Sequence, residues 1–432
     1  MDFPGKGTIG MKLGIALAGG GSKGAYEMGV WQALRELDVA YDIVTGTSIG
    51  AVNGVMMVQG DYEPCLDLWH KVTAERLMKN GLNLKHDMEY YFENRDQLLS
   101  FAKGYAASRG ADISPYIELL HQYIRPEAFF ASQVDYAAVS ARLPGMQYTE
   151  VRKTDMQPDT IWQWVLASSS CCPVFPICEI DGENYIDGGY ADNLPISAAF
   201  RMGADRVIAV ALKQGVFEKK YANHPLVTCI EPSRPLGGFM DFEHDIMEKN
   251  LALGYTDTMK TMWRYFGRVY AFRPGGREVL REYMRDYFLW LLRWELTPPA
   301  SRVESMLDRV RGETPVTDRI LTGRTDDSLT LACMTLDYLM EALGYAHEEA
   351  YDVQALLPEL HAALMAEKLP PALENARALS VTLEKNDLGA VLAKAGTKRD
   401  SNEFLIATVM LYLRRKFAPE AEAEAMPEAT LA

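Results

Sequence analysis

Cysteine is scarce in this chain and follows no metal-binding or disulfide pattern. Six cysteines are spread over 432 residues, Cys171 and Cys172 are adjacent, and no CxxC pair occurs. Zinc sites and disulfide frameworks need closely spaced or regularly spaced pairs. The pattern therefore predicts reduced thiols, no metal site and a cytoplasmic location.

Long apolar runs are also missing. The longest uncharged run, residues 160–178, contains a glutamine, three serines and two prolines, which makes it a poor membrane-spanning helix. Residues 1–10 have neither the apolar core nor the cleavage site of a signal peptide. We expect a chain that is not exported and does not span a membrane.

Basic residues are outnumbered by acidic ones. The chain has 44 basic and 59 acidic residues and a net charge of −15. Because nucleic acids bind basic surfaces, this balance disfavours nucleic acid as a partner, and it disfavours strong electrostatic binding to anionic membranes. A hydrophobic content of 48% is that of a globular protein, and the length suffices for two or three domains.

Short apolar runs alternate with helical patterns over residues 11–272. An apolar run at 12–17 ends at a glycine cluster, helical spacing follows over 24–37, and a second run at 42–45 precedes another helical pattern at 49–58. This order predicts an α/β domain with a mostly parallel central sheet. Further strands are predicted at 134–141, 147–151, 184–186 and 206–212.

The pattern changes after about residue 275. Strand signals disappear, and residues 273–418 are predicted to form a helical C-terminal region, with helices at 276–296, 299–311, 326–343, 352–367, 371–395 and 400–417. Residues 419–432 are rich in alanine and glutamate and are predicted to be a disordered tail. The aromatic segment 283–294 fits either a core or dimer helix, or a helix that covers a site or enters a membrane interface.

The glycine cluster Gly19-Gly20-Gly21-Ser22-Lys23-Gly24 has three interpretations. It matches the dinucleotide pattern G-x-G-x-x-G after a strand, and Asp38 and Asp42 lie near the spacing of a ribose-binding acid. It is not a P-loop, because the lysine is followed by glycine. Consecutive glycine amides at a helix N-terminus can also bind an oxyanion. The third interpretation is a tight turn with no ligand.

The segment Gly46-Thr47-Ser48-Ile49-Gly50 is typical of a nucleophile elbow. It fits G-x-S-x-G and lies between an apolar strand and an apolar helix. Small residues flank such a serine because its backbone is strained and crowded. A hydrolase of the usual kind adds a histidine, but none of the seven lies after a short strand beside glycines: His70, His86, His121, His224, His244, His347 and His361.

A third glycine-marked segment contains a candidate carboxylate. Asp187-Gly188-Gly189 follows a short apolar strand, and the two glycines leave the aspartate uncrowded. The ends of strands are where an α/β sheet keeps its site. The other interpretation is a plain aspartate–glycine turn.

Taken together, these motifs resemble those of the patatin-like phospholipases. The resemblance rests on residues 19–24, 46–50 and 187–189, on Pro173-Val174-Phe175-Pro176 and on Asn193-Leu194-Pro195. It covers about residues 11–270 and implies the three-layer patatin-like fold. It also implies a Ser–Asp dyad without histidine, and an ester hydrolase that needs no cofactor.

The resemblance assigns roles to individual residues. Ser48 is the expected nucleophile, Asp187 the expected general base, and Gly19, Gly20, Gly21 and Ser22 the expected oxyanion hole. Supporting positions are Lys23, where many members have arginine, and Gly24, Gly46, Gly50, Gly188 and Gly189.

The expected function is that of a lipid acyl hydrolase of phospholipase A or lysophospholipase type, working through an acyl-enzyme. Its partners are phospholipid, lysophospholipid or other acyl-ester substrates, with peripheral membrane contact as an option. The alternative is a nucleotide- or phosphate-binding α/β protein that uses the loop 19–24.

Overall fold

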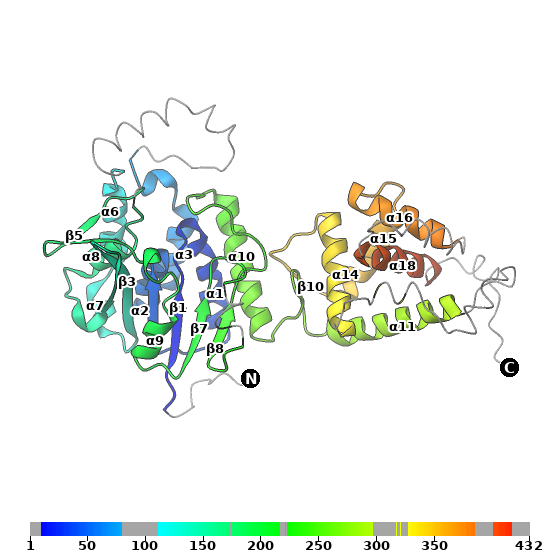
Figure 1. The fold of residues 1–432 in the computed structure, drawn as a ribbon, viewed down its shortest axis with the longest axis horizontal. Coiled ribbons are helices and arrows are strands. Elements are labelled where there is room, and N and C mark those ends of the chain that lie inside the picture. Colours follow the sequence, from blue (N-terminus) through cyan, green and yellow to red (C-terminus); the bar gives the residue numbers. More distant parts are fainter. Residues whose placement is uncertain are drawn as a thin grey trace. The chain divides into compact units, whose positions relative to one another are not determined.

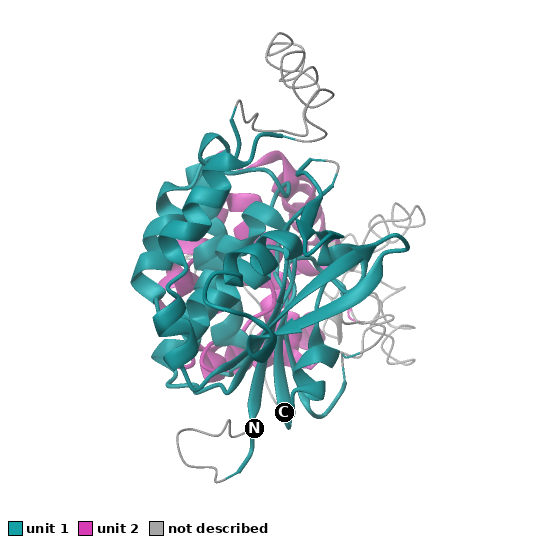
Figure 2. Ribbon diagram, turned by 90° about the vertical axis from the view of Figure 1, so that its left-hand side faces the viewer, with its two compact units in different colours: residues 1–263 teal, residues 264–432 magenta. Residues whose placement is uncertain are grey.

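The structure is a computed structural model divided into two compact units (Figures 1 and 2). Unit 1 comprises Met1–Trp263 and unit 2 comprises Arg264–Ala432. The described residues are 10–79, 111–172, 174–216, 221, 223–296, 317, 320, 327–384 and 401–416.

Unit 1 is built on an eight-stranded mixed sheet. Five strands run parallel in the order β3-β2-β1-β7-β8. They are β1 (Leu13–Leu17), β2 (Ile43–Thr47), β3 (Asp135–Leu143), β7 (Arg206–Val210) and β8 (Val227–Ile230). Antiparallel strands complete the β3 side: β4 (Gln147–Arg152), β5 (Cys178–Ile180) and β6 (Glu183–Asp187). The predicted mostly parallel sheet is confirmed.

Helices cover both faces of this sheet, so unit 1 has three layers. Strand β7 illustrates the division, because Val207 and Ala209 pack in the cluster of α9 (Ile196–Arg201), whereas Ile208 and Val210 pack in the larger cluster of the opposite face. With both faces buried, the central strands are apolar throughout rather than alternating. This explains why the sequence showed them as continuous apolar runs.

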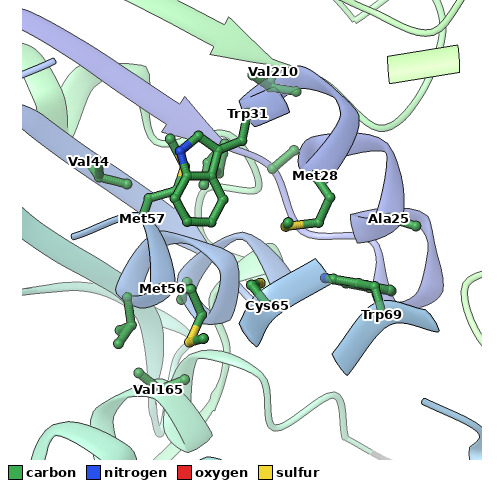
Figure 3. Packing of buried hydrophobic residues seen from close by; sticks show 14 of the residues in the cluster. Ala25, Met28, Trp31, Val44, Met56, Met57, Cys65, Trp69, Val165 and Val210 are labelled. Carbon is green, nitrogen blue, oxygen red and sulfur yellow. The ribbon is translucent and has the colours of Figure 1, made fainter. Parts of the chain in front are cut away.

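The larger cluster holds most of the helices of unit 1 (Figure 3). Trp31, Met56 and Trp69 come from three different helices and are all buried there. The helices are α1 (Ala25–Glu36), α2 (Ile49–Gln59), α3 (Tyr62–Lys71), α6 (Ser114–Tyr123), α7 (Pro126–Ala131), α8 (Ile161–Ser168) and α10 (His244–Thr261).

Strand β3 aligns the ends of two other strands. Its residues Ala137–Val139 pair with both β2 and β4, so these two lie on opposite edges of β3. Its residues Ser140–Arg142 pair with both β4 and β6, so β6 continues on the same edge as β2. Val139 is opposite Thr47 and Ser140 is opposite Asp187. The residue after β2 and the last residue of β6 therefore meet.

Unit 2 is helical, with its own apolar core. Its helices are α11 (Gly276–Leu296), α14 (Ser328–Leu343), α15 (Val353–Leu364), α16 (Pro371–Glu384) and α18 (Ser401–Lys416). The sequence showed no strand beyond residue 275, but β10 (Ala350–Tyr351) pairs in parallel with β9 (Ala271–Phe272). Two residues are too few to leave a periodic signal. The helix predicted at 299–311 and the tail at 419–432 lie outside the described residues.

The aromatic segment of α11 packs inside unit 2. Tyr287 and Leu291 are fully buried, and Trp290 stacks on Trp294 with ring centroids 6.0 Å apart. Both tryptophans pack against the core of the unit. These contacts favour the core interpretation of the segment. No helix among the described residues is both long and apolar enough to cross a membrane.

Candidate active site

Ser48 lies at a strained turn between β2 and α2. Its backbone has φ 55° and ψ −124°, outside the regions that side-chain-bearing residues favour. A Cβ atom on Gly46 would lie 2.2 Å from the carbonyl oxygen of Gly50, and one on Gly50 would lie 2.6 Å from that of Leu17. Both flanking residues must therefore be glycine for the turn to form, as an elbow requires.

The structure brings Ser48 and Asp187 together. Both side chains line the same cavity, and the Ser48 hydroxyl is close enough to the Asp187 carboxylate to lower its pKa. The contact follows from the shared edge of β3, because Ser48 comes directly after β2 and Asp187 ends β6. A glycine is again needed next to the carboxylate, since a Cβ on Gly188 would lie 2.1 Å from the carbonyl oxygen of Val139.

Asp187 is a buried carboxylate with few partners. It is 6% exposed, and its Oδ1 accepts a hydrogen bond of 2.7 Å from the amide of Gly189. Burial raises the pKa of Asp187 above its ordinary value, while the hydrogen bonds from Ser48 and from the Gly189 amide act in the opposite direction. The net effect is a carboxylate that binds a proton more readily than a solvated aspartate does.

The glycine loop differs from the four-donor oxyanion hole expected from the sequence. The amide of Gly19 donates to the carbonyl oxygen of Asn193 at 3.0 Å, and the amide of Ser22 donates to that of Phe239 at 2.9 Å. These two amides already have acceptors. Within the described residues, those of Gly20 and Gly21 donate to none, so the candidate donors are Gly20 and Gly21 alone.

The remaining motif residues support this loop. The Lys23 amide donates to the Gly20 carbonyl oxygen at 3.4 Å, and burial, followed by the charge of Lys213, lowers the pKa of the Lys23 side chain. A Cβ on Gly24 would lie 2.5 Å from Cγ1 of Ile49, the residue after Ser48. Gly24 therefore allows the loop to pack closely against the elbow, and the Lys23 amide closes the turn that begins at Gly20.

Asn193 joins the glycine loop to the segment that follows Asp187. Its side-chain amide donates to the carbonyl oxygen of Gly19 at 3.1 Å, in addition to the backbone bond already described. The sequence showed Asn193 only as part of a downstream motif. Its role in holding the loop depends on two segments far apart in the chain, which no local pattern reveals.

Ser48 and Asp187 open onto an apolar cavity of about 330 Å³. Gly20, Gly21 and Asn193 line it next to them. Most other lining side chains are apolar and come from α2, α3, α6 and α8: Val52, Met56, Leu68, Trp69, Leu119, Leu120, Tyr123 and Val165. Such a cavity, with a few converging polar groups, has the character of a small-molecule site.

No histidine of the described residues lines this cavity. His70 bonds Glu248 and His121 packs on Trp162, and His224, His244, His347 and His361 are not among the lining residues. His86 and Pro173 lie outside the described residues. A site without a histidine base stays a prediction.

The geometry disfavours the dinucleotide interpretation of the glycine loop. A ribose-binding acid would have to lie at the carboxyl end of β2, near the loop. Asp42 instead precedes β2, where its carboxylate accepts the amide of Leu13 at 2.8 Å. Asp38 lies earlier still, just after α1. Both carboxylates are at the opposite end of the parallel strands from the loop.

Comparisons with known proteins point to one family. The family model described as patatin-like phospholipase matches residues 15–200. The chain is 28% identical over 203 residues to lysophospholipase nte1 of Aspergillus terreus, covering 46% of this chain and 12% of that protein. It is 30% identical over 207 residues to patatin-like phospholipase domain-containing protein 7 of Mus musculus, covering 46% of this chain and 14% of that protein.

The chain thus spans only about an eighth of the length of the curated relatives it matches. Among solved structures, VipD from Legionella pneumophila aligns over 95% of this chain and 93% of its own, with 14% identity and a TM-score of 0.39.

Proposed function

We propose that this chain, whose residues 15–200 belong to the patatin-like phospholipase family, is a lipid esterase. It hydrolyses carboxylic esters of lipids, as a phospholipase A or a lysophospholipase. The observation that carries the proposal is the approach of a serine on a strained turn to a buried carboxylate beside an apolar cavity. Ser48 is the nucleophile and Asp187 the general base.

Acylation begins with the proton of the Ser48 hydroxyl. Oγ attacks the ester carbonyl carbon while Asp187 takes the proton, and the carbonyl oxygen becomes an oxyanion. When this intermediate collapses, the bond to the leaving alcohol breaks and Asp187 gives it the proton. The lipid alcohol leaves, and the acyl group stays on Ser48.

Deacylation repeats these steps with water. Asp187 takes a proton from the water as its oxygen attacks the acyl carbon. Collapse of the second intermediate releases the fatty acid and returns the proton to Ser48 Oγ. A buried carboxylate is suited to both transfers, because burial raises its basicity above that of a solvated aspartate.

The amides of Gly20 and Gly21 are the proposed oxyanion donors. They line the cavity beside Ser48 and have no acceptor within the described residues. They lie at the start of the helical turn that leads into α1, where the peptide dipoles favour negative charge. One such donor is worth about 3 kcal/mol of transition-state stabilisation.

The substrate proposed is a lipid with at least one long acyl chain. An apolar lining from four helices favours a hydrocarbon chain over a polar group. A related protein bears the name lysophospholipase, which makes a single-chain lysophospholipid the first substrate to test. Neither the head group nor the acyl length is part of the proposal.

Peripheral contact with a membrane belongs to the proposal as well, with a cytoplasmic location. Tyr190 and Phe239 line the cavity and are 46% and 39% exposed, so aromatic surface lies where a lipid would enter. Flotation with phosphatidylcholine vesicles tests this contact. A Phe239→Ser, Tyr190→Ser variant should float less than a Trp263→Ser control, whose tryptophan is exposed but does not line the cavity.

The test of the function is release of fatty acid from lysophosphatidylcholine by the full chain. The wild type should release it, and Ser48→Ala should lose the activity while keeping its circular dichroism spectrum. Release that persists undiminished in Ser48→Ala would rule out the proposed nucleophile. A bound-nucleotide absorbance in the purified protein, without hydrolysis, would favour the phosphate-binding alternative.

A further inference from the structure

Two of three consecutive serines at the end of α8 and just after it contact the proposed dyad, Ser168 at Ser48 and Ser170 at Asp187. Ser168, Ser169 and Ser170 are all buried, and Ser168 and Ser170 are fully so. Buried hydroxyls are costly unless they are hydrogen-bonded, so the partners of each one indicate what it does. The three serines have different partners.

The hydroxyl of Ser168 bridges the elbow and the central sheet. Its Oγ accepts a hydrogen bond of 3.0 Å from the backbone amide of Ser48 and donates one of 2.6 Å to the carbonyl oxygen of Val139. Val139 is the β3 residue opposite Thr47, at the point where β2 and β6 meet. One hydroxyl therefore ties the strained nucleophile residue to the strand that aligns the site.

Ser170 acts on the other member of the dyad through its backbone. Its carbonyl oxygen accepts the amide of Asp187 at 2.9 Å. Its hydroxyl, by contrast, donates to the carbonyl oxygen of Leu166 in the last turn of α8 at 2.8 Å. Replacing the Ser170 side chain would leave the contact to Asp187 in place.

We propose that Ser168 is a positioning residue for ester hydrolysis, which holds the Ser48 backbone in its strained conformation so that the hydroxyl points at Asp187. This inference rests on the proposed function. Without the Ser168 hydroxyl, the Ser48 amide loses its acceptor in a partly buried place. We expect the backbone around Ser48 to relax toward a less strained conformation, because the hydrogen bond that held its amide in place is lost.

The expected consequence is a loss of turnover rather than of binding. A displacement of about 1 Å between reacting groups can cost about a hundredfold in rate. Ser168 does not line the cavity, whereas Val165 and Ser169 of the same segment do. Ser168→Ala should therefore lower kcat about 10- to 100-fold and leave KM within about twofold.

Ser170→Ala is the matched control. It removes the same atom from an equally buried serine two residues away, but the lost bond is a local one to Leu166, four residues earlier in the chain. It should keep kcat within about twofold of the wild type. Ser168→Cys, which nearly preserves the side-chain shape and retains a weak donor and acceptor, should fall between Ser168→Ala and the wild type.

The experiment measures kcat and KM for a p-nitrophenyl acyl ester and the rate of fluorophosphonate labelling, each per folded molecule by circular dichroism. The expected result is slow turnover and slow labelling in Ser168→Ala alone, with partial recovery in Ser168→Cys. Equal values for Ser168→Ala and Ser170→Ala, with an active wild type, overturn the positioning role only. A wild type that neither hydrolyses nor labels removes the proposed function and this inference together.

Discussion

The two units of this chain treat buried polar groups differently. Unit 1 buries carboxylates, an amine and amides, among them Glu27, Asn53, Lys153, Asp187 and Asp257. In the described part of unit 2, the buried polar residues are all hydroxyls: Thr317, Thr335, Ser380 and Thr408. Burying a charged or amide group is costly unless it is paired, so such groups persist where they hold elements together or do chemistry.

The partners of these groups differ in kind. In unit 1, Asn53 of α2 bonds Glu27 of α1 at 2.8 Å and Trp69 of α3 at 3.0 Å, close to the glycine loop. In unit 2, the Thr408 hydroxyl of α18 bonds the Tyr287 hydroxyl of α11 at 2.6 Å. Both units therefore join helices through buried polar contacts, but among the described residues only those of unit 1 involve buried carboxylate and amide side chains. A buried carboxylate that could exchange a proton with a substrate is thus available in unit 1.

The largest expected effect is a difference in kcat between two aspartate variants, one in each unit. Asp187→Asn should lower kcat by at least about a thousandfold, because an amide cannot accept the serine proton, and should leave the fold intact. Asp337→Asn is the counterpart, since that carboxylate accepts the amide of Tyr270 at 3.1 Å within unit 2. It should lower the free energy of unfolding by about 1–3 kcal/mol.

Both variants are assayed with a p-nitrophenyl ester and by urea unfolding. Activity per folded molecule should stay at the wild-type level for Asp337→Asn. An equal loss of kcat in both variants would contradict the assignment of the chemistry to unit 1.

The next effect is a difference in stability between two glycine variants. Gly46→Ala should leave unit 1 misfolded or destabilised by several kcal/mol, because the added Cβ would lie 2.2 Å from a backbone oxygen that cannot move without opening the elbow. Gly344→Ala places a Cβ in open space at the end of α14, where φ is 76°. It should cost only about 1 kcal/mol of backbone strain.

Thermal melting followed by circular dichroism checks this pair. A Gly46→Ala protein as stable as Gly344→Ala would mean that the elbow does not have the close backbone packing described for it.

A smaller effect concerns the pH dependence of stability. Burial raises the pKa of Glu27 to about 8, against a small opposite effect from its hydrogen bonds. Because the folded-state pKa exceeds the unfolded one, the folded chain binds the extra proton between them. The stability from this group is complete below about pH 4.5 and is lost as pH rises toward 8.

We expect the wild type to lose on the order of 2 kcal/mol between pH 6 and pH 8 from this group. Glu27→Gln, which cannot ionise, should show a flatter profile in urea unfolding of unit 1. Parallel profiles for the two proteins would show that Glu27 does not change its charge in this range. None of the described residues of unit 2 is a buried carboxylate that could make stability fall with pH in the same way.

The parts of unit 1 that are local in sequence could be predicted. The strands β1 and β2 were visible because they are buried on both faces and end at glycines. Gly46 and Gly50 were visible because the elbow needs both within five consecutive residues. Asp187 was visible as an aspartate at the end of a strand, but its pairing with Ser48 in a candidate dyad came from the resemblance to the patatin-like phospholipases.

The contacts that depend on register could not be predicted. Ser168 and Ser48 are 120 residues apart, and the acceptor of the Ser22 amide is Phe239. No local pattern tells which amides of a glycine loop are already bonded, so four oxyanion donors were expected where two remain. Ser168 could have been noticed only as part of an unusual run of three serines at a helix end.

The central claim is that Ser48 is the activated nucleophile of unit 1. Treating the full chain with a fluorophosphonate and mapping the label by mass spectrometry of peptides tests it most directly. The account predicts one label, on Ser48, with labelling abolished in Ser48→Ala and strongly slowed in Asp187→Asn. A label on any other serine, or an undiminished label in Ser48→Ala, would contradict it.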